Sequence, residues 1–351
     1  MRILLLGGTG AMGIHLSKII SDRGDNIVIT SRSSKESTKQ IEYREGDAKD
    51  LDFLNNILEE KWDTIVDFMV YSQVDFKERI EKLLSRTSQY IFLSSSRVYD
   101  NSKEFITEDT TKLVDTTTDK EYLQTDEYAL SKARQEDILK SSNKQNWTII
   151  RPYITYSEIR LQLGTLEKEN WLYRAIHGRT IIFSEDIKNH FTTLTYGLDV
   201  STAMSKFIGN SSCLGESYHI TNDTSYKWDD LLNVYLDVLE EKLGSRPKVL
   251  YQNLSDYSSW NPGKYQIIYD RLFDRKFDNT KINQFMDTSD FIDARKGIEQ
   301  CLKSFLENPK FSAISWRQEA IKDKITKEAT PLSELTGLKS KIKYVLFRYI
   351  F

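Results

Sequence analysis

The residues best suited to chemistry in this sequence are Tyr128 and Lys132, in the segment Tyr-Ala-Leu-Ser-Lys. The segment has helical character through Ile138, so the two side chains emerge on one face of a helix, one turn apart. A nearby ammonium group favours the phenolate and lowers the pKa of a tyrosine. Tyr128 could then give a proton to a carbonyl oxygen or take one from a hydroxyl group. A tyrosine and a lysine at this spacing are also common by chance, so the surrounding motifs must carry the argument.

A run of serines precedes this helix. The segment Gln89–Ser94 is expected to be a strand, and it continues into Ser95, Ser96, Arg97, Val98 and Tyr99. A serine hydroxyl at the carboxyl end of a strand can hydrogen-bond the oxygen that a tyrosine protonates. The sequence therefore predicts an acid–base site built from a strand end and a helix.

A glycine-rich segment follows the apolar run Ile3–Leu6 and precedes the amphipathic segment Ile14–Arg23. This order predicts strand, tight turn and helix. Backbone N–H groups in such a turn can approach a pyrophosphate, and the positive end of the helix dipole faces its charge. The segment indicates dinucleotide binding, although small residues here could serve only close packing of helix and strand. The residues expected to bind the cofactor are Gly7, Thr9, Gly10, Met12 and Gly13.

The end of the expected second strand, Asn26–Thr30, indicates which dinucleotide would bind. An acidic residue at this point accepts a hydrogen bond from the ribose 2′-hydroxyl of NAD, whereas arginine and small hydroxyl residues suit the 2′-phosphate of NADP. Ser31 and Arg32 stand here, so the sequence favours NADP(H), with NAD(H) as the alternative and a solvated arginine as the simplest reading of Arg32. Asp47 is placed to accept from the adenine amino group, or to cap the helix that follows, a role for which Asp50 is an equal candidate.

Strands and helices alternate over the first 150 residues, and this alternation predicts an α/β fold with a Rossmann-type, doubly wound, mostly parallel sheet. The expected strands and helices beyond those named above are a strand from Ile41, helix Leu51–Glu60, strand Asp63–Val70 and helix Val74–Ser85.

The second half alternates less regularly and is richer in aromatic and charged residues, which predicts a smaller α+β substrate domain whose segments interleave with the first. Its expected elements are strands Phe191–Thr195 and Tyr218–Asn222 and helices Trp228–Leu243 and Phe291–Glu307. The predicted division is residues 1–150 for NAD(P) binding, 151–315 for substrate binding, and 316–351 for a charged extension with a basic tail. Residues 318–336, rich in lysine and glutamate, are expected to be solvated.

Composition excludes several function classes. The net charge of -3 over 351 residues, spread over both signs, gives no nucleic-acid footprint. The two cysteines form no disulfide framework and fit a reducing cytosol, and no signal peptide is evident, so a cytoplasmic location is expected. The four histidines are scattered without metal-ligand spacing, so no metal site is expected.

The segment 337–351 alternates four cations with apolar residues. Such a segment could lie on an anionic membrane surface. The pattern favours the alternative, a terminal helix docked on its own domain or on a partner subunit.

The order and spacing of the glycine turn, the serine run, Tyr128, Lys132 and the pair Arg151-Pro152 resemble the extended short-chain dehydrogenase/reductase superfamily, in the NAD-dependent epimerase/dehydratase branch. The resemblance covers roughly residues 1–300. It implies a Rossmann domain, a C-terminal domain for a nucleotide-linked sugar, and a homodimer through a helical interface.

The resemblance also assigns roles. Gly7, Gly10 and Gly13 match the pyrophosphate glycines and Asp47 the adenine-contacting aspartate. Ser95 takes the position of the catalytic serine or threonine, Tyr128 that of the acid/base and Lys132 that of its helper, which also anchors the nicotinamide ribose. Pro152 falls in the segment along the nicotinamide. The candidates for contact with the substrate are Ser96, Tyr71, Arg179 and Arg271, and each arginine could equally be a surface charge.

Two departures from the family pattern are informative. The fourth strand ends in Met69–Ser72, where the family usually has small residues near the cofactor, so Tyr71 is expected to narrow the pocket or to reach the substrate. Family 4,6-dehydratases carry Asp-Glu directly after the catalytic threonine, where this chain has Ser96 and Arg97, so elimination would lack its acid and base. The favoured function is NADPH-dependent reduction of a keto group on a nucleotide-activated sugar. Its rivals are an epimerase with tightly bound NAD and, from another class, a non-catalytic nucleotide-sensing or RNA-associated scaffold.

Overall fold

The computed structural model describes residues 1–350, and the chain divides into two compact units that are treated separately below. Unit 1 comprises residues 1–157, 193–225 and 275–294. Unit 2 comprises residues 158–192, 226–274 and those from 295 onward. Phe351 lies outside the described residues.

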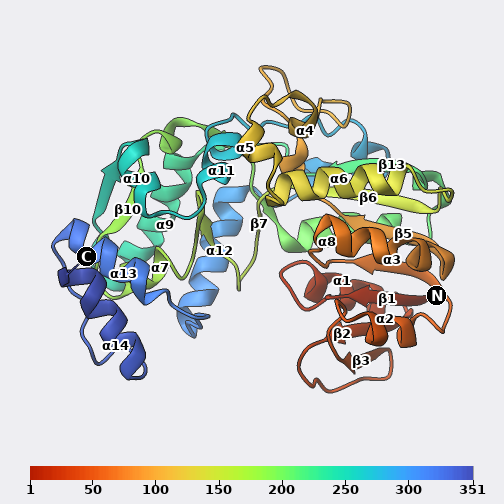
Figure 1. The fold of residues 1–351 in the computed structure, drawn as a ribbon, viewed down its shortest axis with the longest axis horizontal. Helices are drawn as coiled ribbons and strands as arrows, with labels where there is room; N and C mark the ends of the chain where they lie inside the picture. The colour runs from red at the N-terminus through yellow and green to blue at the C-terminus, as the bar shows by residue number, and fades with distance from the viewer. Residues whose placement is uncertain (351) are drawn as a thin grey trace. The chain divides into compact units, whose positions relative to one another are not determined.

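Unit 1 is organised around a seven-stranded sheet in which every neighbouring pair is parallel (Figure 1). The strand order is β13-β6-β5-β4-β1-β2-β3. The strands are β1 (Arg2–Leu6), β2 (Asn26–Ser31), β3 (Ile41–Glu45), β4 (Trp62–Asp67), β5 (Thr87–Leu93), β6 (Trp147–Pro152) and β13 (Glu216–Ile220). The Rossmann-type fold predicted from the sequence is confirmed. The order reverses between β1 and β4, and parallel sheets bind ligands outside the carboxyl ends of the strands at such a point.

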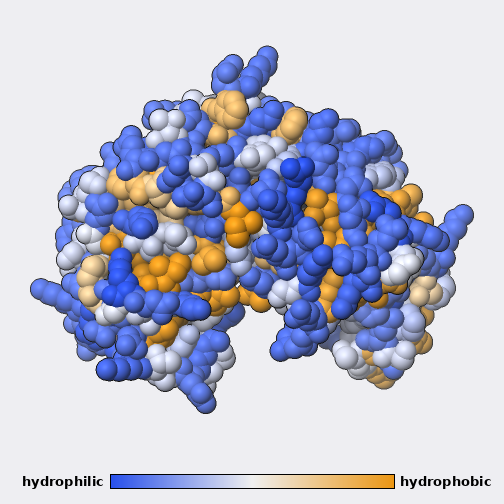
Figure 2. Space-filling view, turned by 180° about the vertical axis from the view of Figure 1, so that it is seen from behind, coloured by the Kyte–Doolittle hydropathy of each residue, from blue (hydrophilic) through white to orange (hydrophobic). Residues whose placement is uncertain are grey.

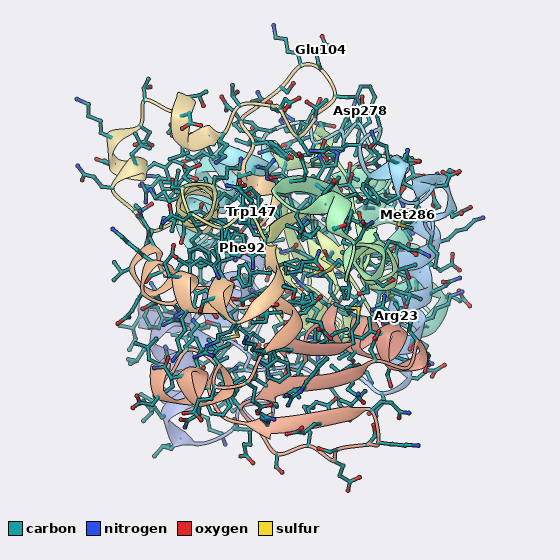
Figure 3. All side chains as sticks on the ribbon, turned by 90° about the vertical axis from the view of Figure 1, so that its right-hand side faces the viewer. Arg23, Phe92, Glu104, Trp147, Asp278 and Met286 are labelled. Carbon is teal, nitrogen blue, oxygen red and sulfur yellow. The ribbon has the colours of Figure 1, made fainter. Side chains whose placement is uncertain are left out.

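Helices cover both faces of the sheet because alternate residues of each strand face opposite sides. Ile3 and Leu5 of β1 pack in a core cluster with α1 (Gly13–Asp22) and α8 (Gly197–Phe207). Leu4 and Leu6 pack on the other face with α2 (Leu51–Ile57), α3 (Gln73–Ser85) and α6 (Tyr128–Lys140). Phe92 and Trp147 lie inside this second cluster, whereas Glu104 lies on an outer loop (Figure 3).

Local capping sets the helix boundaries. The Asp50 side chain accepts from the Phe53 N–H and caps α2, so Asp50 rather than Asp47 is the N-cap. Ser72 and Asp75 form a reciprocal capping box that starts α3. The predicted strand 63–70 was too long, because its backbone leaves the sheet at Asp67.

The remaining elements of unit 1 are short. They are the 3-10 turns η1 (Ser96–Val98), η3 (Ser211–Cys213), η5 (Ile282–Gln284) and η6 (Thr288–Asp290), helices α4 (Leu113–Thr116) and α5 (Lys120–Leu123), and strands β7 (Thr155–Tyr156) and β12 (Thr195–Tyr196). The strand predicted at 191–195 is in fact two, β11 (Phe191–Thr192), which belongs to unit 2, and β12, which pairs with β7.

Unit 2 combines helices with small sheets. Its strands are β8 (Gln162–Leu163), β9 (Leu166–Glu167), β10 (Ile181–Ser184), β11, β14 (Tyr226–Lys227) and β15 (Val249–Gln252). Its helices and turns are α7 (Leu172–Ile176), η2 (Ile187–Asn189), α9 (Trp228–Leu243), α10 (Leu254–Trp260), α11 (Lys264–Gln266), η4 (Ile267–Arg271), α12 (Ala294–Glu307), α13 (Trp316–Thr326), α14 (Leu338–Val345) and the π-helical turn η7 (Leu346–Ile350). No helix among residues 1–350 is long and apolar enough to cross a membrane.

The expectation that residues 318–336 are solvated was wrong. Glu319, Lys322 and Asp323 of α13 are almost fully buried. The buried Arg174 guanidinium donates to Glu319 and Asp323 and also to Glu328. Charges that pair with one another can be buried, and the sequence pattern alone does not reveal the partners.

The glycine turn between β1 and α1 depends on close backbone contacts. Gly7 has a φ of 72°, in the left-handed region that favours glycine. A Cβ on Gly13 would lie 2.4 Å from the carbonyl oxygen of Gly8, whereas a Cβ on Gly10 would meet nothing within 4 Å. Gly13 therefore lets α1 start directly against the turn, and Gly10 borders open space.

This contrast gives a matched pair of substitutions. Gly13→Ala should lower the free energy of unfolding by about 1–3 kcal/mol, because the added methyl group meets rigid backbone that no rotamer change can relieve. Gly10→Ala should change it by less than about 0.5 kcal/mol. Chemical denaturation of both variants measures the difference. Equal stability of the two would show that the turn relaxes freely and that the close approach is not a constraint.

Candidate functional site

The residues predicted to do chemistry lie in unit 1, at the carboxyl ends of β1, β4 and β5 and at the start of α6. Because β1 and β4 are neighbours and β4 pairs with β5, the strand ends meet along one edge of the sheet. The site is therefore placed at the point where the strand order reverses.

The glycine turn offers a cradle for a phosphate group. Thr9 and Gly10 are exposed, and the space beside Gly10 is open. The Gly7 N–H donates to Thr30 Oγ1, and the Met12 carbonyl accepts from Ser201 Oγ. These two hydrogen bonds hold the two ends of the turn. At the start of α1 the Ile14 and Leu16 N–H groups donate to the carbonyl oxygens of Gly10 and Met12, and the positive end of the helix dipole faces the turn. These features fit a dinucleotide pyrophosphate.

The end of β2 carries the residues expected to choose the cofactor. Ser31 is buried and its Oγ accepts from the Ser33 N–H, while Arg32 is exposed. Asp47 is also exposed, and its carboxylate accepts from the Lys49 N–H. Since Asp50 caps α2, Asp47 is not committed to the helix.

Lys132 is buried beneath the partly exposed Tyr128. Its Nζ donates to the carbonyl oxygens of Leu93 (2.7 Å) and Met69 (3.3 Å), at the ends of β5 and β4. The same nitrogen lies 6.0 Å from the centre of the Tyr128 ring and 4.5 Å from that of Phe92. Burial lowers the pKa of Lys132 to about 8, against a partial opposing effect of Asp67 and Glu136.

The three serines after β5 have different hydrogen-bond partners. Ser94 Oγ donates to Glu136 and Ser96 Oγ donates to the Arg151 carbonyl, both inside the protein. Ser95 begins the 3-10 turn η1, and its Oγ accepts from the Arg97 N–H at 3.2 Å. The Ser95 hydroxyl proton is not used in that contact, so it can be donated to a further oxygen. Ser96, expected to contact substrate, is fully buried and engaged with β6.

Arg97 is a site residue to which the sequence assigned no role. Its guanidinium carbon lies 5.5 Å from the centre of the Tyr128 ring, and its Nη2 donates to Glu127 at 2.6 Å. Glu127 in turn caps α6 by accepting from the Ala129 N–H. Arg97 thus ties the turn after β5 to the start of α6 and places a positive charge over the tyrosine ring.

A buried ion pair fixes the far end of the same helix face. Glu136 lies one turn beyond Lys132, and both its oxygens accept from Arg151 of β6, at 2.8 and 2.7 Å. Arg151 also donates to the Tyr99 hydroxyl. The Arg151 charge holds the pKa of Glu136 below its usual range in spite of burial. The pair Arg151-Pro152 was noticed in the sequence, but nothing there identified Glu136 as its partner.

Asp67 is a second residue without a role in the sequence analysis. It ends β4 opposite Leu6 of β1 and is fully buried. Its carboxylate accepts from the Met69 N–H and from the Tyr90 hydroxyl, and burial raises its pKa. Because Asp67 orients the Met69 peptide region, it helps to aim the Met69 carbonyl at Lys132.

The other predicted residues are dispersed. Pro152 is buried at the end of β6. Tyr71 is buried in the core cluster on the α3 face, with the Arg79 guanidinium 4.5 Å from its ring centre. Arg179 and Arg271 lie in unit 2, where both are buried and engaged. Arg179 donates to both oxygens of Glu334, and Arg271 donates to the Gly164 carbonyl and to Asp270.

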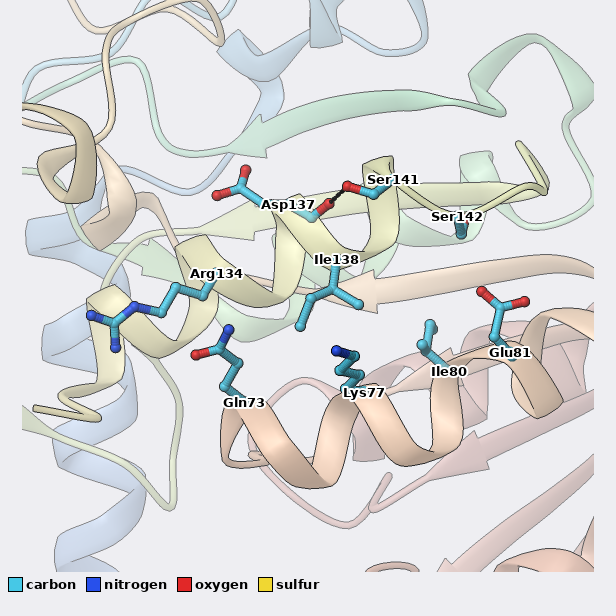
Figure 4. Close-up of a pocket in the computed structure, with 9 residues that line it drawn as sticks. All are labelled: Gln73, Lys77, Ile80, Glu81, Arg134, Asp137, Ile138, Ser141 and Ser142. Atoms are coloured by element: carbon cyan, nitrogen blue, oxygen red, sulfur yellow. Dashed lines mark hydrogen bonds between the residues drawn. The ribbon is translucent and has the colours of Figure 1, made fainter.

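A groove of about 530 Å³ lies on the outer side of unit 1, between α3 and α6 (Figure 4). Apolar Ile80 and Ile138 line it together with charged residues such as Lys77 and Asp137. It contains neither the glycine turn nor Tyr128. No group of three or more potential metal ligands occurs among residues 1–350.

Fold and site together define a Rossmann-type protein of the extended short-chain dehydrogenase/reductase class. The sequence profile of the NAD dependent epimerase/dehydratase family matches residues 3–212, and the chain belongs to this family.

The chain is also similar to a plant protein at low identity. The chloroplast stem-loop binding protein of 41 kDa b from Arabidopsis thaliana is 24% identical over 245 residues, which are 66% of this chain and 61% of that protein. The chain thus spans about three fifths of the length of this relative.

Two solved structures share the fold. The epimerase Mth375 from Methanothermobacter thermautotrophicus has a TM-score of 0.68 and 16% identity, covering 88% of this chain and 92% of that one. The UDP-glucuronic acid 4-epimerase from Bacillus cereus, in complex with UDP-glucuronic acid and NAD, has a TM-score of 0.67 and 13% identity, covering 88% and 99%.

The Glu136–Arg151 pair can be tested on its own. Glu136→Gln should lower the free energy of unfolding by about 3–5 kcal/mol, because it leaves the Arg151 charge buried without a counter-charge. Asp137→Asn, at an exposed position next along the helix, should cost less than about 1 kcal/mol. Urea denaturation gives both values. A small and equal cost for the two would mean that Arg151 does not depend on Glu136.

Lys132 should give a pH dependence of stability. Its pKa of about 8 in the folded chain lies below the unfolded value of 10.5, so the unfolded chain binds more protons between these pH values. The free energy of unfolding should therefore gain about 3 kcal/mol from this group as pH rises from 8 to 10.5. Lys132→Met should lack this gain. The measurement is the difference between the two stability–pH curves, and parallel curves would contradict the low pKa.

Proposed function

We propose that this protein is an NAD(P)-dependent oxidoreductase that acts on a nucleotide-activated sugar and reduces a keto group. The observation that carries the proposal is the pairing of a partly exposed Tyr128 with a buried Lys132 beside Ser95, at the strand ends next to the glycine turn. Family membership and the fold shared with nucleotide-sugar epimerases support it.

The bound nicotinamide would supply or accept the hydride. Tyr128 would give its phenolic proton to the oxygen that becomes the alcohol, and Ser95 would donate a hydrogen bond to the same oxygen. The Lys132 ammonium would lower the cost of the resulting phenolate, and Arg97 above the ring would act in the same direction. Lys132 would also hold the nicotinamide ribose.

The absence of a carboxylate at the end of β2 supports NADP(H). Exposed Arg32 can move to pair with a 2′-phosphate, and Ser31 can donate a hydrogen bond. The Asp47 carboxylate would accept a hydrogen bond from the adenine amino group. The glycines of the turn, with Thr9 and Met12, would surround the pyrophosphate, and Pro152 would lie along the nicotinamide.

An epimerase is the second candidate, and the names of the solved structures that share the fold favour it. It would use the same tyrosine, lysine and serine but retain its NAD through the catalytic cycle. A homodimer and a cytoplasmic location complete the proposal.

The test compares wild type with Tyr128→Phe. The variant should lose at least about 100-fold in the rate of NADPH oxidation with a nucleotide-linked keto-sugar, because proton transfer typically contributes 10²–10⁴-fold. Its affinity for NADPH, followed by cofactor fluorescence, should stay within about twofold of wild type. Retained turnover would exclude Tyr128 as the acid.

The same preparations separate the alternatives. Denaturing the purified protein and identifying any released dinucleotide by mass spectrometry should give no NAD, and titration should favour NADPH over NADH. Retained NAD would establish the epimerase instead. If neither cofactor binds while an RNA stem-loop does, the chain is a scaffold, as the name of its plant relative suggests.

A further inference from the structure

The helix α14 and the turn η7 of unit 2 have two apolar faces, and only one is covered. Tyr344 is buried in a small core with Ala320 and Leu335, and Phe347 packs against that core. The Tyr344 hydroxyl donates to Asp323 and accepts from the Thr330 N–H. The Arg348 Nε donates to the Glu328 carbonyl, which fastens η7 as well. The inward face is thus fixed on α13 and the loop that follows it.

The outward face carries a second apolar stripe. Leu338, Ile342, Val345 and Tyr349 follow the spacing of one helix face, and their exposed fractions are 73%, 52%, 37% and 63%. Ile350 is exposed by 67%. These five residues are a third of the fifteen large hydrophobic residues exposed in the described chain, gathered within thirteen positions. Figure 2 shows hydrophobic side chains reaching the surface at its lower right, where this helix lies.

Cations flank the stripe on both sides. Lys339 and Lys343 follow it around the helix in one direction, and Lys341 and Arg348 in the other. The three lysines make no ion pair within residues 1–350, and no acidic residue follows Glu334 in the sequence. The helix therefore presents an apolar ridge between two rows of positive charge.

We propose that the outward face of α14 and η7 binds the surface of a membrane that contains anionic lipids. A helix that lies in such an interface buries its apolar face at the boundary of headgroups and acyl chains, while lysines on its flanks meet the lipid phosphates. Only the side chains of the apolar stripe would enter the membrane interface, since the opposite face of the helix is packed on unit 2. The binding is peripheral, and it is independent of the proposed hydride transfer.

Other occupants fit this face less well. A second copy related by a two-fold axis would bring lysine rows against lysine rows, which opposes association. The unpaired bases of RNA are bound largely by stacking on aromatic rings, but the stripe is mainly aliphatic. A membrane leaflet satisfies both the aliphatic ridge and the uniform positive rim.

The experiment is co-sedimentation of the full chain with phosphatidylcholine vesicles, with and without phosphatidylserine. The protein should bind the phosphatidylserine vesicles at least about tenfold more tightly, and high salt should remove most of this difference. Lys339→Ser, Lys341→Ser and Lys343→Ser combined should weaken binding about 100-fold, at about fivefold for each cation. Ile342→Ser should weaken binding to both kinds of vesicle.

A matched control changes the same charge elsewhere in unit 2. Lys242→Ser, Lys248→Ser and Lys310→Ser combined remove three exposed lysines outside α14 and should leave binding within about twofold of wild type. Equal loss in both triple variants would overturn the proposal, because diffuse charge would then explain the binding. So would the absence of binding to phosphatidylserine vesicles. Two further measurements complete the test: light scattering for dimerisation, and anisotropy for binding of an RNA stem-loop. If the protein does not bind vesicles, and if Ile342→Ser or the α14 lysine variant alone abolishes dimerisation or RNA binding, the face belongs to that other occupant.

Discussion

The candidate site depends on the burial of a polar helix face against the sheet. Lys132 and Glu136 of α6 are both almost fully buried, and neither could be so without a partner. Lys132 is held by two backbone carbonyls at strand ends, and Glu136 by the guanidinium of Arg151 in β6. The two contacts fix both the rotation of α6 and its position along the sheet. These contacts place Tyr128, which lies on the same face one turn before Lys132, at the carboxyl ends of the strands.

This arrangement explains why the chemistry and the fold cannot be separated here. The Lys132 ammonium costs stability below its pKa of about 8, and an apolar residue of similar size would remove that cost. The compensating contacts come from the end of β4, which borders the switch point, and from the end of β5, its neighbour in the sheet. In the proposed function, the lysine that supports Tyr128 is thus held by the same strand ends that shape the site.

The sequence was sufficient for the parts of the fold that follow from apolar periodicity. The predicted helix Trp228–Leu243 matches α9, and the first strand, glycine turn and first helix lie where expected. The sequence also predicted a helix from Tyr128 through Ile138, but it did not predict which polar residues of that helix are buried or what they contact. In α6 the buried positions include Ser131, Lys132, Gln135 and Glu136, so no apolar stripe marks its inner face. The Glu136–Arg151 pair and the contacts of Asp67 join residues whose proximity depends on sheet order, which no local pattern states.

In unit 2 the sequence pattern was also misleading, because charged residues expected to be solvated are buried. Charges in α13 suggested a solvated segment, yet they enclose Arg174 and form the base on which α14 rests. Apolar residues in α14 suggested either a docked or a membrane-facing helix, and its two faces differ in this respect. Tyr344 and Phe347 account for the docking, which leaves Leu338, Ile342 and Val345 without a folding role. Exposed aliphatic side chains reduce solubility without adding to the core, so their retention beside unpaired lysines needs a reason outside the fold. An anionic membrane surface supplies that reason, because it is the partner for which both the ridge and its positive rim are favourable.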